Sequence, residues 1–161
     1  MSLEETIATH LRRQGWHLAL VETTTGGLMT TRLIRLAGSS AYFDRSIVAY
    51  SKEAKIQSLG VDPTVLERHG AVSVETVTAM AVGLRRLSHA DLVLAETGIA
   101  GPIQGRSPKP LGSTCFVLLT PSGKFPEEVR FAGDRQAIQE QIAGHGLGMI
   151  ARYLTSLPPG A

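Results

Sequence analysis

Residues 17–27 read HLALVETTTGG. The apolar run 17–22 predicts a short strand, and residues 26–36 predict an amphipathic helix. Three threonines and two glycines therefore lie in a turn between a strand and the start of a helix. Glycine lets a backbone approach a ligand, and a helix N-terminus presents free N–H groups. The stretch predicts an α/β unit with an anion-binding turn, although taken alone it also fits a simple helix N-cap.

The rest of the chain alternates between helical and strand patterns. This alternation in one unit predicts a single three-layer α/β/α domain with a mixed central sheet over residues 1–161, with a core at about 3–153 and a frayed tail at 157–161. Glycines at 144, 146 and 148 within the last helix predict close backbone packing. We expect helices over 3–13, 51–59, a short segment from 63, 74–87 and 134–153, and strands over 42–50, 92–96, 114–120 and 127–131.

Composition excludes several classes of protein. The formal net charge is only +2 and no basic run occurs, which argues against a nucleic-acid partner. No apolar run approaches the length of a membrane span, and the start of the chain is acidic where a secretory signal is basic. The single Cys115 excludes an intramolecular disulfide and is expected to act as a small buried hydrophobe. We therefore expect a cytoplasmic protein.

Tyr50 and Lys55 form a second candidate site. Tyr50 ends a predicted strand, and Lys55 lies one turn into the following helix. A lysine whose pKa is lowered by burial can act as the general base for a hydroxyl nucleophile. The alternative is a solvated helix lysine. Lys52, on a different face of the same helix, provides an internal control.

The segment 97–112 is the third candidate. It is punctuated by glycine and proline, contains Lys109 between two prolines, and is too long for a simple connection. Such loops often bind ligands, although a disordered crossing is equally compatible with this composition. Of the histidines, we expect His69 to cap a helix end and His145 to be structural.

Seven motifs together resemble the CinA C-terminal-domain family, whose members include bacterial nicotinamide-nucleotide amidohydrolases. They occur in the family's order and spacing and cover nearly the whole chain, so we expect a stand-alone form of that domain. The motifs are ETTTGG at 22–27, GSSAYF at 38–43, YSKEAK at 50–55, HGAVS at 69–73, TGIAGP at 97–102, KPLG at 109–112 and GDR at 133–135.

The resemblance implies hydrolysis of nicotinamide mononucleotide to nicotinate mononucleotide and ammonia. It places the family's serine nucleophile at Thr23, its lysine base at Lys55 and its assisting tyrosine at Tyr50. It implies no metal or other cofactor, a small-molecule nucleotide as partner, and a homodimer or higher homo-oligomer. The physiological role stays open between pyridine-nucleotide salvage and a competence or damage response.

The ligand requires a ring slot, an oxyanion site and a phosphate site. Tyr42 is a candidate for stacking on the pyridine ring or, equally, for the core. The phosphate candidates are Ser39 with Ser40, Lys109, and Arg135, and the sequence does not rank them. Backbone N–H groups in the turn Thr25-Gly26-Gly27, or at residues 98–101, are candidates for stabilising the oxyanion. We expect the same turn, and Thr97, Gly98, Ala100 and Gly101, to contact the substrate.

Two departures from the family pattern concern this site. Thr23 replaces serine, and its β-methyl group restricts χ1 and adds bulk at the attacking oxygen. Residues 103–106 read IQGR where the family has an acid and paired glycines, which changes the wall and charge of the pocket. Two other functions therefore stay open: an enzyme acting on another small amide, and a catalytically silent module that binds pyridine nucleotides or regulates.

Overall fold

The fold is a five-stranded mixed sheet between two layers of helices. The computed structural model describes residues 1–158 and gives the strand order β2-β1-β3-β4-β5. The predicted three-layer α/β/α architecture with a mixed sheet is confirmed. β1 (Leu18–Glu22) is parallel to β2 (Phe43–Val48) and β3 (Leu92–Gly98), whereas β4 (Ser113–Thr120) and β5 (Gly123–Arg130) extend the sheet in antiparallel fashion.

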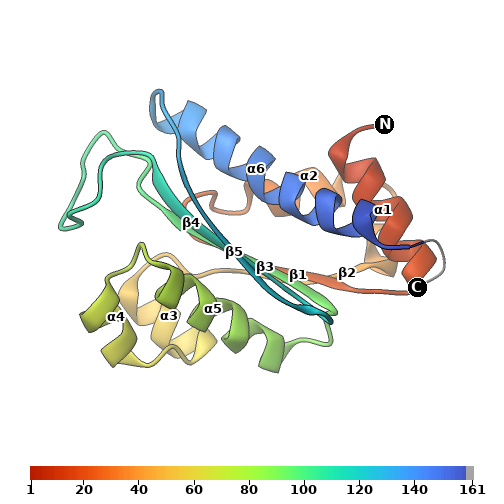
Figure 1. The fold of residues 1–161 in the computed structure, drawn as a ribbon, viewed down its shortest axis with the longest axis horizontal. Coiled ribbons are helices and arrows are strands. Elements are labelled where there is room, and N and C mark those ends of the chain that lie inside the picture. Colours follow the sequence, from red (N-terminus) through yellow and green to blue (C-terminus); the bar gives the residue numbers. More distant parts are fainter. Residues whose placement is uncertain (159–161) are drawn as a thin grey trace.

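Helices cover both faces of the sheet (Figure 1). A 3₁₀ turn, η1 (Ser39–Ala41), precedes β2. None of the helices within residues 1–158 has the length and apolar character of a membrane span. One layer contains α1 (Leu3–Gln14), α2 (Leu28–Ile34) and α6 (Arg135–Ser156), and the other contains α3 (Lys52–Leu59), α4 (Pro63–His69) and α5 (Val74–Leu87).

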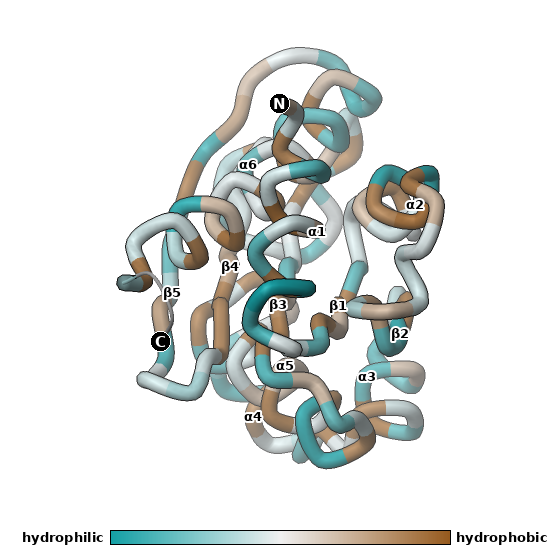
Figure 2. Tube along the Cα trace, turned by 90° about the vertical axis from the view of Figure 1, so that its right-hand side faces the viewer, coloured by the Kyte–Doolittle hydropathy of each residue, from teal (hydrophilic) through white to brown (hydrophobic). Residues whose placement is uncertain are grey.

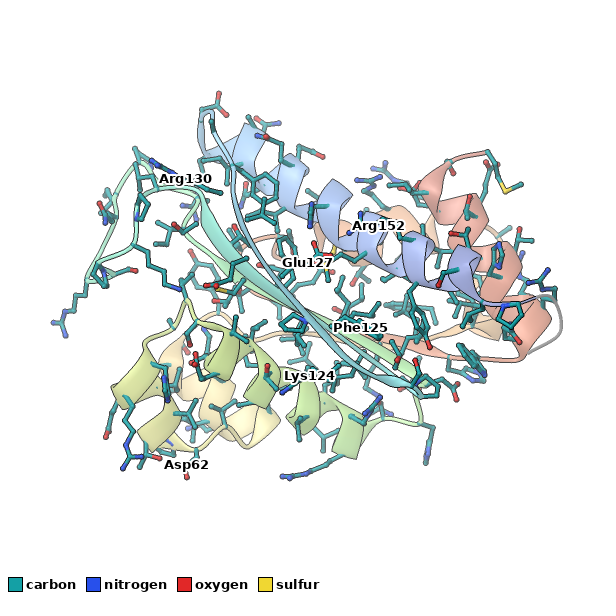
Figure 3. All side chains as sticks on the ribbon, in the orientation of Figure 1. Asp62, Lys124, Phe125, Glu127, Arg130 and Arg152 are labelled. Carbon is teal, nitrogen blue, oxygen red and sulfur yellow. The ribbon has the colours of Figure 1, made fainter. Side chains whose placement is uncertain are left out.

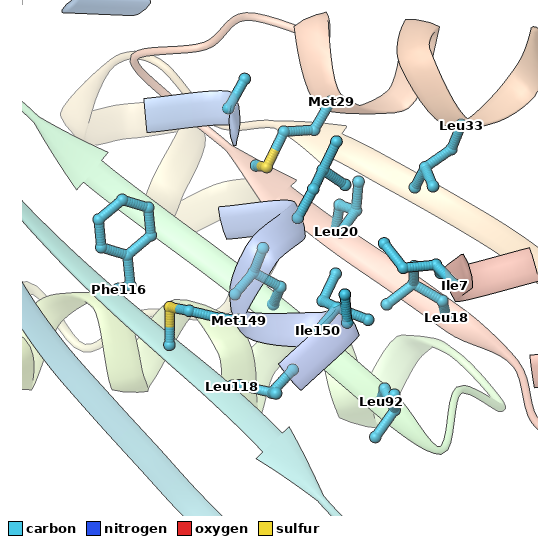
Figure 4. Close-up of a cluster of buried hydrophobic side chains, with 14 of the residues drawn as sticks. Ile7, Leu18, Leu20, Met29, Leu33, Leu92, Phe116, Leu118, Met149 and Ile150 are labelled. Atoms are coloured by element: carbon cyan, nitrogen blue, oxygen red, sulfur yellow. The ribbon is translucent and has the colours of Figure 1, made fainter. Parts of the chain in front are cut away.

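The central strands bury both faces, so they read as continuous apolar runs. Successive side chains of a strand point to opposite faces. In β1, Leu18 and Leu20 join the cluster under α1, α2 and α6, while Ala19 and Val21 join the cluster under α3, α4 and α5. Figure 4 shows the first cluster, in which Phe116 of β4 lies near Met149 of α6. Figure 2 shows the same apolar character along β3 and β4.

Helix starts follow the expected caps. The Ser2 hydroxyl accepts the N–H of Glu5 at 3.1 Å, and the Glu5 carboxylate accepts the N–H of Ser2 at 2.7 Å, which completes a capping box. Ser51, Ser73 and Asp134 cap α3, α5 and α6 with the side-chain half of this arrangement, each accepting one main-chain N–H three residues on.

The last strand begins earlier than the sequence indicates. We expect a turn at 121–123 and a strand only from 127, but β5 already pairs at Gly123, opposite Thr120. Pro126 and the charged residues of the segment conceal the strand pattern. They are tolerated because β5 is an edge strand whose outer side needs no partner. Figure 3 shows Lys124, Phe125, Glu127 and Arg130 along this strand.

Close backbone packing in α6 occurs at one of the three predicted glycines. A Cβ at Gly146 would lie 2.9 Å from Met29 Sδ and 3.0 Å from Leu94 Cδ2. For a Cβ at Gly144, the nearest atom would be Arg32 Nη1 at 3.9 Å. A tighter approach, not expected from the sequence, occurs in α5, where a Cβ at Gly83 would lie 1.9 Å from the carbonyl oxygen of Leu59 at the end of α3.

Gly83 and Gly144 therefore form a matched pair for a stability test. Alanine normally favours a helix over glycine by about 1 kcal/mol. We expect Gly144→Ala to raise the free energy of unfolding by about 0.5–1 kcal/mol, and Gly83→Ala to lower it by about 2 kcal/mol because of overpacking. Urea unfolding followed by circular dichroism measures both. Equal effects of the two substitutions would contradict the α3–α5 packing.

Candidate active site

The candidate site lies where the parallel strands β2, β1 and β3 end. In open α/β sheets, ligands bind outside the carboxyl ends of the strands where the strand order reverses. β1 has β2 on one side and β3 on the other, so this point falls between β1 and β3. A pocket of about 510 Å³ lies there, lined by Thr23, Thr24, Tyr50, Lys55, residues 69–72, 97–101 and 103–109, and Arg135.

Thr23 lies at the bottom of this pocket and is 5% exposed. Its hydroxyl donates to the backbone carbonyl of Glu96 at 2.9 Å, and its N–H donates to Glu96 Oε1 at 2.8 Å. Within residues 1–158, no hydrogen bond joins Thr23 Oγ1 to Lys55. The hydroxyl is therefore directed toward β3 in this structure.

Lys55 is a buried lysine, not a solvated one. Its side chain reaches the same pocket as Thr23, the residue is 4% exposed, and Nζ donates to the carbonyl oxygen of Tyr50 at 2.9 Å. Burial lowers the pKa of Lys55, and the nearby charge of Glu96 opposes this effect. Lys52 is exposed and its Nζ lies 3.9 Å from Glu67 Oε1. The two lysines of one helix therefore have different environments.

Tyr50 and Arg135 close one side of the pocket. Tyr50 follows β2 and is 65% exposed, and its hydroxyl accepts a hydrogen bond from Arg135 Nη2 at 3.1 Å. Arg135 is the first residue of α6, and its Nη1 donates to the carbonyl of Gly101 at 2.7 Å. One guanidinium thus joins the segments that follow β2 and β3.

The segment after β3 forms the opposite wall. The Thr97 hydroxyl donates to the carbonyl of Ala71, between α4 and α5, at 2.8 Å. Gly98 allows a close approach, because a Cβ there would lie 2.7 Å from Thr114 Oγ1 and 3.2 Å from Thr24 Oγ1. Ala100 and Gly101 continue this wall.

The cations of the pocket have few acidic partners. Lys109 Nζ lies 3.3 Å from Glu128 Oε1. His69 is the last residue of α4, the helix end at which we expect it, and it also lines the pocket; its Nδ1 lies 3.8 Å from Glu75 Oε2. Arg106 lines the pocket as well, and no Asp or Glu is found among the described lining residues. The pocket therefore has a positive character.

The predicted anion cradle in the threonine–glycine turn is already occupied by the protein's own carboxylates. The N–H of Thr25 donates to Glu96 Oε1 at 3.0 Å, and the N–H of Gly27 donates to Glu22 Oε2 at 2.9 Å. Thr25, Gly26 and Gly27 do not line the pocket. Their predicted role in binding the substrate is corrected to one in fixing the turn.

The structure does not bring Ser39, Ser40 and Tyr42 to the pocket. They precede β2, and a segment before a parallel strand lies at the edge opposite to the one where the strand ends. Tyr42 is fully buried in the core, with its ring 5.2 Å from the Arg12 guanidinium carbon. Its predicted place on a pyridine ring is therefore corrected to a core position.

His145 lies outside the pocket and is structural, in agreement with the expectation from the sequence. Its Nε2 lies 2.6 Å from Glu127 Oε2, and its ring packs against Phe116 with centroids 4.8 Å apart. Arg152 Nη2 donates to the other oxygen of Glu127 at 3.1 Å (Figure 3). This cluster attaches α6 to the edge strand β5.

The residue that sequence reasoning missed is Glu96. It is fully buried beneath Thr23, although it lies in β3 directly after four apolar residues. A signal for it exists: residues 18–23 and 92–97, which include most of β1 and β3, have the related sequences LALVET and LVLAET. These segments pair in parallel, with Leu18 opposite Leu92 and Val21 opposite Ala95, so Glu22 and Glu96 come to lie side by side.

A family model described as CinA C-terminal domain matches residues 1–154. The chain belongs to this family. A CinA-like protein of Syntrophobacter fumaroxidans is 44% identical over 153 residues, and one of Shewanella loihica is 39% identical over 158 residues. These alignments cover 95% and 98% of the chain but only 36% and 37% of the relatives. The chain therefore spans little more than a third of the length of the curated relatives it matches.

Solved structures of CinA-family proteins have the same fold. The competence or damage-inducible protein from Enterobacter asburiae superposes with a TM-score of 0.91 at 33% identity, covering 94% of this chain and 96% of that one. The competence/damage inducible protein CihA from Agrobacterium tumefaciens gives a TM-score of 0.88 at 34% identity, covering 97% and 100%. The resemblance read from the seven motifs is thus confirmed at the level of the family.

Cys115 provides a test of burial beside this CinA-family pocket. The residue is 1% exposed, as expected for a buried hydrophobe, and burial raises the pKa of its thiol to about 11. The reactive thiolate is therefore scarce at about pH 8. We expect almost no reaction of the native protein with Ellman's reagent, and one thiol per chain in denaturant. Rapid labelling of the native protein would contradict the buried position.

Proposed function

We propose that the pocket hydrolyses the carboxamide of nicotinamide mononucleotide to nicotinate mononucleotide and ammonia, without a metal or other cofactor. The observation that carries this proposal is the meeting of Thr23, Tyr50 and Lys55, from two separate segments, in one pocket with Lys55 buried. An exposed lysine would be protonated at neutral pH and unable to accept a proton. Burial favours the neutral amine that a general base requires.

The reaction is an acyl transfer. Thr23 Oγ1 attacks the carboxamide carbon while Lys55 Nζ takes the hydroxyl proton, and Lys55 then gives that proton to the departing ammonia. Water then attacks the resulting ester while Lys55 accepts a proton from it, and Lys55 returns that proton to Thr23 Oγ1 as the ester bond breaks. Nicotinate mononucleotide leaves as a carboxylate, and its acid proton passes to solvent. The Thr23 hydroxyl must turn from the Glu96 carbonyl toward Lys55 for the first step. Tyr50, held by Arg135, is placed to donate a hydrogen bond to the substrate.

The N–H groups that we propose as oxyanion donors are not those of the turn Thr25-Gly26-Gly27. Thr24, Ala100 and Gly101 line the pocket, and their N–H groups have no hydrogen-bond partner in the part of the chain that the structure describes. Free backbone N–H groups in a site that excludes water are well suited to stabilise the negative charge of a tetrahedral intermediate.

The positive lining supports a phosphorylated substrate. Arg106, Lys109 and Arg135 surround the pocket without an acidic residue among its described lining. Arginine and lysine are the usual partners of phosphate, and arginine can bind it with two parallel hydrogen bonds. The change to Ile103 and Arg106 in this segment leaves the wall more apolar and more cationic than the family pattern implies.

A second candidate, a silent module that binds pyridine nucleotides, is favoured by one observation. Thr23 donates to the Glu96 carbonyl and not to Lys55, so the hydroxyl and the amine are not hydrogen-bonded to each other. This arrangement suits a binding site in which the hydroxyl is structural. The two candidates differ in turnover and agree in predicting nucleotide binding.

Lys55 and Lys52 provide the first test. We expect Lys55→Ala to lower ammonia release from nicotinamide mononucleotide by about 10³-fold, the range of a lost general base. Lys52→Ala, on the same helix, should retain the wild-type rate. A coupled assay for ammonia measures both. Equal losses in the two variants, or full activity of Lys55→Ala, would exclude Lys55 as the base.

Thr23→Ser tests the nucleophile. Serine removes the β-methyl group and frees χ1 while keeping the hydroxyl. If the hydroxyl attacks the substrate, we expect kcat to rise by about tenfold, which corresponds to ~1.4 kcal/mol of barrier. Thr23→Val, of similar volume but without the hydroxyl, is the control and should be inactive. Nucleotide binding without turnover in wild type and Thr23→Ser alike would support the silent module instead.

A further inference from the structure

Glu96 is a fully buried carboxyl group that the proposed reaction does not use. Its Oε1 accepts the N–H groups of Thr23 at 2.8 Å and Thr25 at 3.0 Å, so it holds the main chain on both sides of Thr24. Among residues 1–158, the one hydrogen bond to its Oε2 is a long contact of 3.4 Å from Thr23 Oγ1. One oxygen is therefore well bound, and the other is buried with a weak partner.

Glu96 and Glu22 meet across one hydroxyl group. Thr25 Oγ1 lies 2.7 Å from Glu22 Oε2 and 2.8 Å from Glu96 Oε1. Both distances are those of full hydrogen bonds, yet the hydroxyl has only one hydrogen to donate. A second hydrogen is needed, and a protonated carboxyl group supplies it. Two carboxyl groups so close together do not both ionise readily.

The hydrogen-bond geometry assigns this proton to the two carboxyl groups together. Glu22 lies at the N-terminus of α2 and accepts the N–H groups of Gly27, Met29 and Thr30 as well as the Thr30 hydroxyl. Burial raises the pKa of Glu96, the hydrogen bonds from Thr25 and Thr23 oppose this effect, and the charge of Glu22 adds to it. Because the Thr25 hydroxyl bridges the two carboxyl groups, the single proton belongs to the pair and not to one residue.

We propose that Glu96 is a positioning residue for Thr23, and that it shares one proton with Glu22 through Thr25. Its carboxyl group fixes the main chain of the turn at Thr23 and Thr25, while its backbone carbonyl accepts the Thr23 hydroxyl. A proton shared by the pair also reduces the negative charge near Lys55. The role of Thr23 as nucleophile rests on the proposed function, whereas the shared proton does not.

Infrared spectroscopy tests the proton without any assay of activity. A protonated carboxyl group has a C=O stretch that is separate from that of carboxylates and shifts in D₂O. At neutral pH we expect this band in the wild-type protein and in the surface control Glu140→Gln, and its loss in Glu96→Gln. Absence of the band from the wild type, or its persistence in Glu96→Gln, would overturn the shared proton.

Kinetics with two substitutions test the positioning. Glu96→Gln keeps a neutral group with an acceptor oxygen, and we expect kcat to stay within about threefold of wild type. Glu96→Val leaves the N–H groups of Thr23 and Thr25 unpaired. It should lower kcat by about a hundredfold with little change in KM, because Glu96 does not line the pocket. Equal activity of Glu96→Val and wild type, or an equal loss in both variants, would overturn the proposal.

The two experiments separate this inference from the proposed function. If the wild-type protein releases no ammonia, the proposed function fails while the infrared band still reports on the shared proton. Should Glu96→Val not fold, as judged by circular dichroism, then Glu96→Gln and the infrared band decide the outcome. A wild type that turns over substrate but lacks the band would keep the function and overturn the role given to Glu96.

Discussion

The site depends on the parallel register of β1 and β3. Because Val21 lies opposite Ala95, the next residues of the two strands, Glu22 and Glu96, are neighbours at the same sheet edge, and so are Thr23 and Thr97. The two carboxyl groups accept the N–H groups of Thr23, Thr25 and Gly27 in the turn before α2, and that of Met29 in the first turn of the helix. A shift of one residue in this pairing would turn these side chains to the other face of the sheet, and the turn would lose its anchors.

The acidic and the cationic side chains of the site lie at different depths. The acidic groups lie beneath the turn, on the side of α2 and α6, where they bind main-chain N–H groups. The cationic side chains of Arg106, Lys109 and Arg135 lie around the opening above it. The helix N-terminus that would otherwise attract an anionic ligand is thus satisfied from inside the protein. The attraction for an anion is left to side chains, which can be changed without disturbing the fold.

Much of this was predictable from the sequence because it depends on local patterns. Strand–helix alternation gave the layers, and the motifs around Thr23, Tyr50 and Lys55 identified residues that share one pocket. Prediction failed where a residue's role depends on its neighbours across the sheet. Tyr42 is polar enough for a binding site but precedes a strand, which places it at the far edge, and Glu96 has no local motif because its partners are 71 and 73 residues away.

Arg135 makes the pocket depend on a helix that lies far along the chain. Its guanidinium is the link between Tyr50 and Gly101, and it belongs to α6, which follows both segments in the sequence. The strands β1, β2 and β3 bring Thr23 and Lys55 together, but one side of the pocket stays open until α6 has docked. The ligand site is therefore complete only when both helical layers are in place, so completion of the pocket reports on completion of the fold.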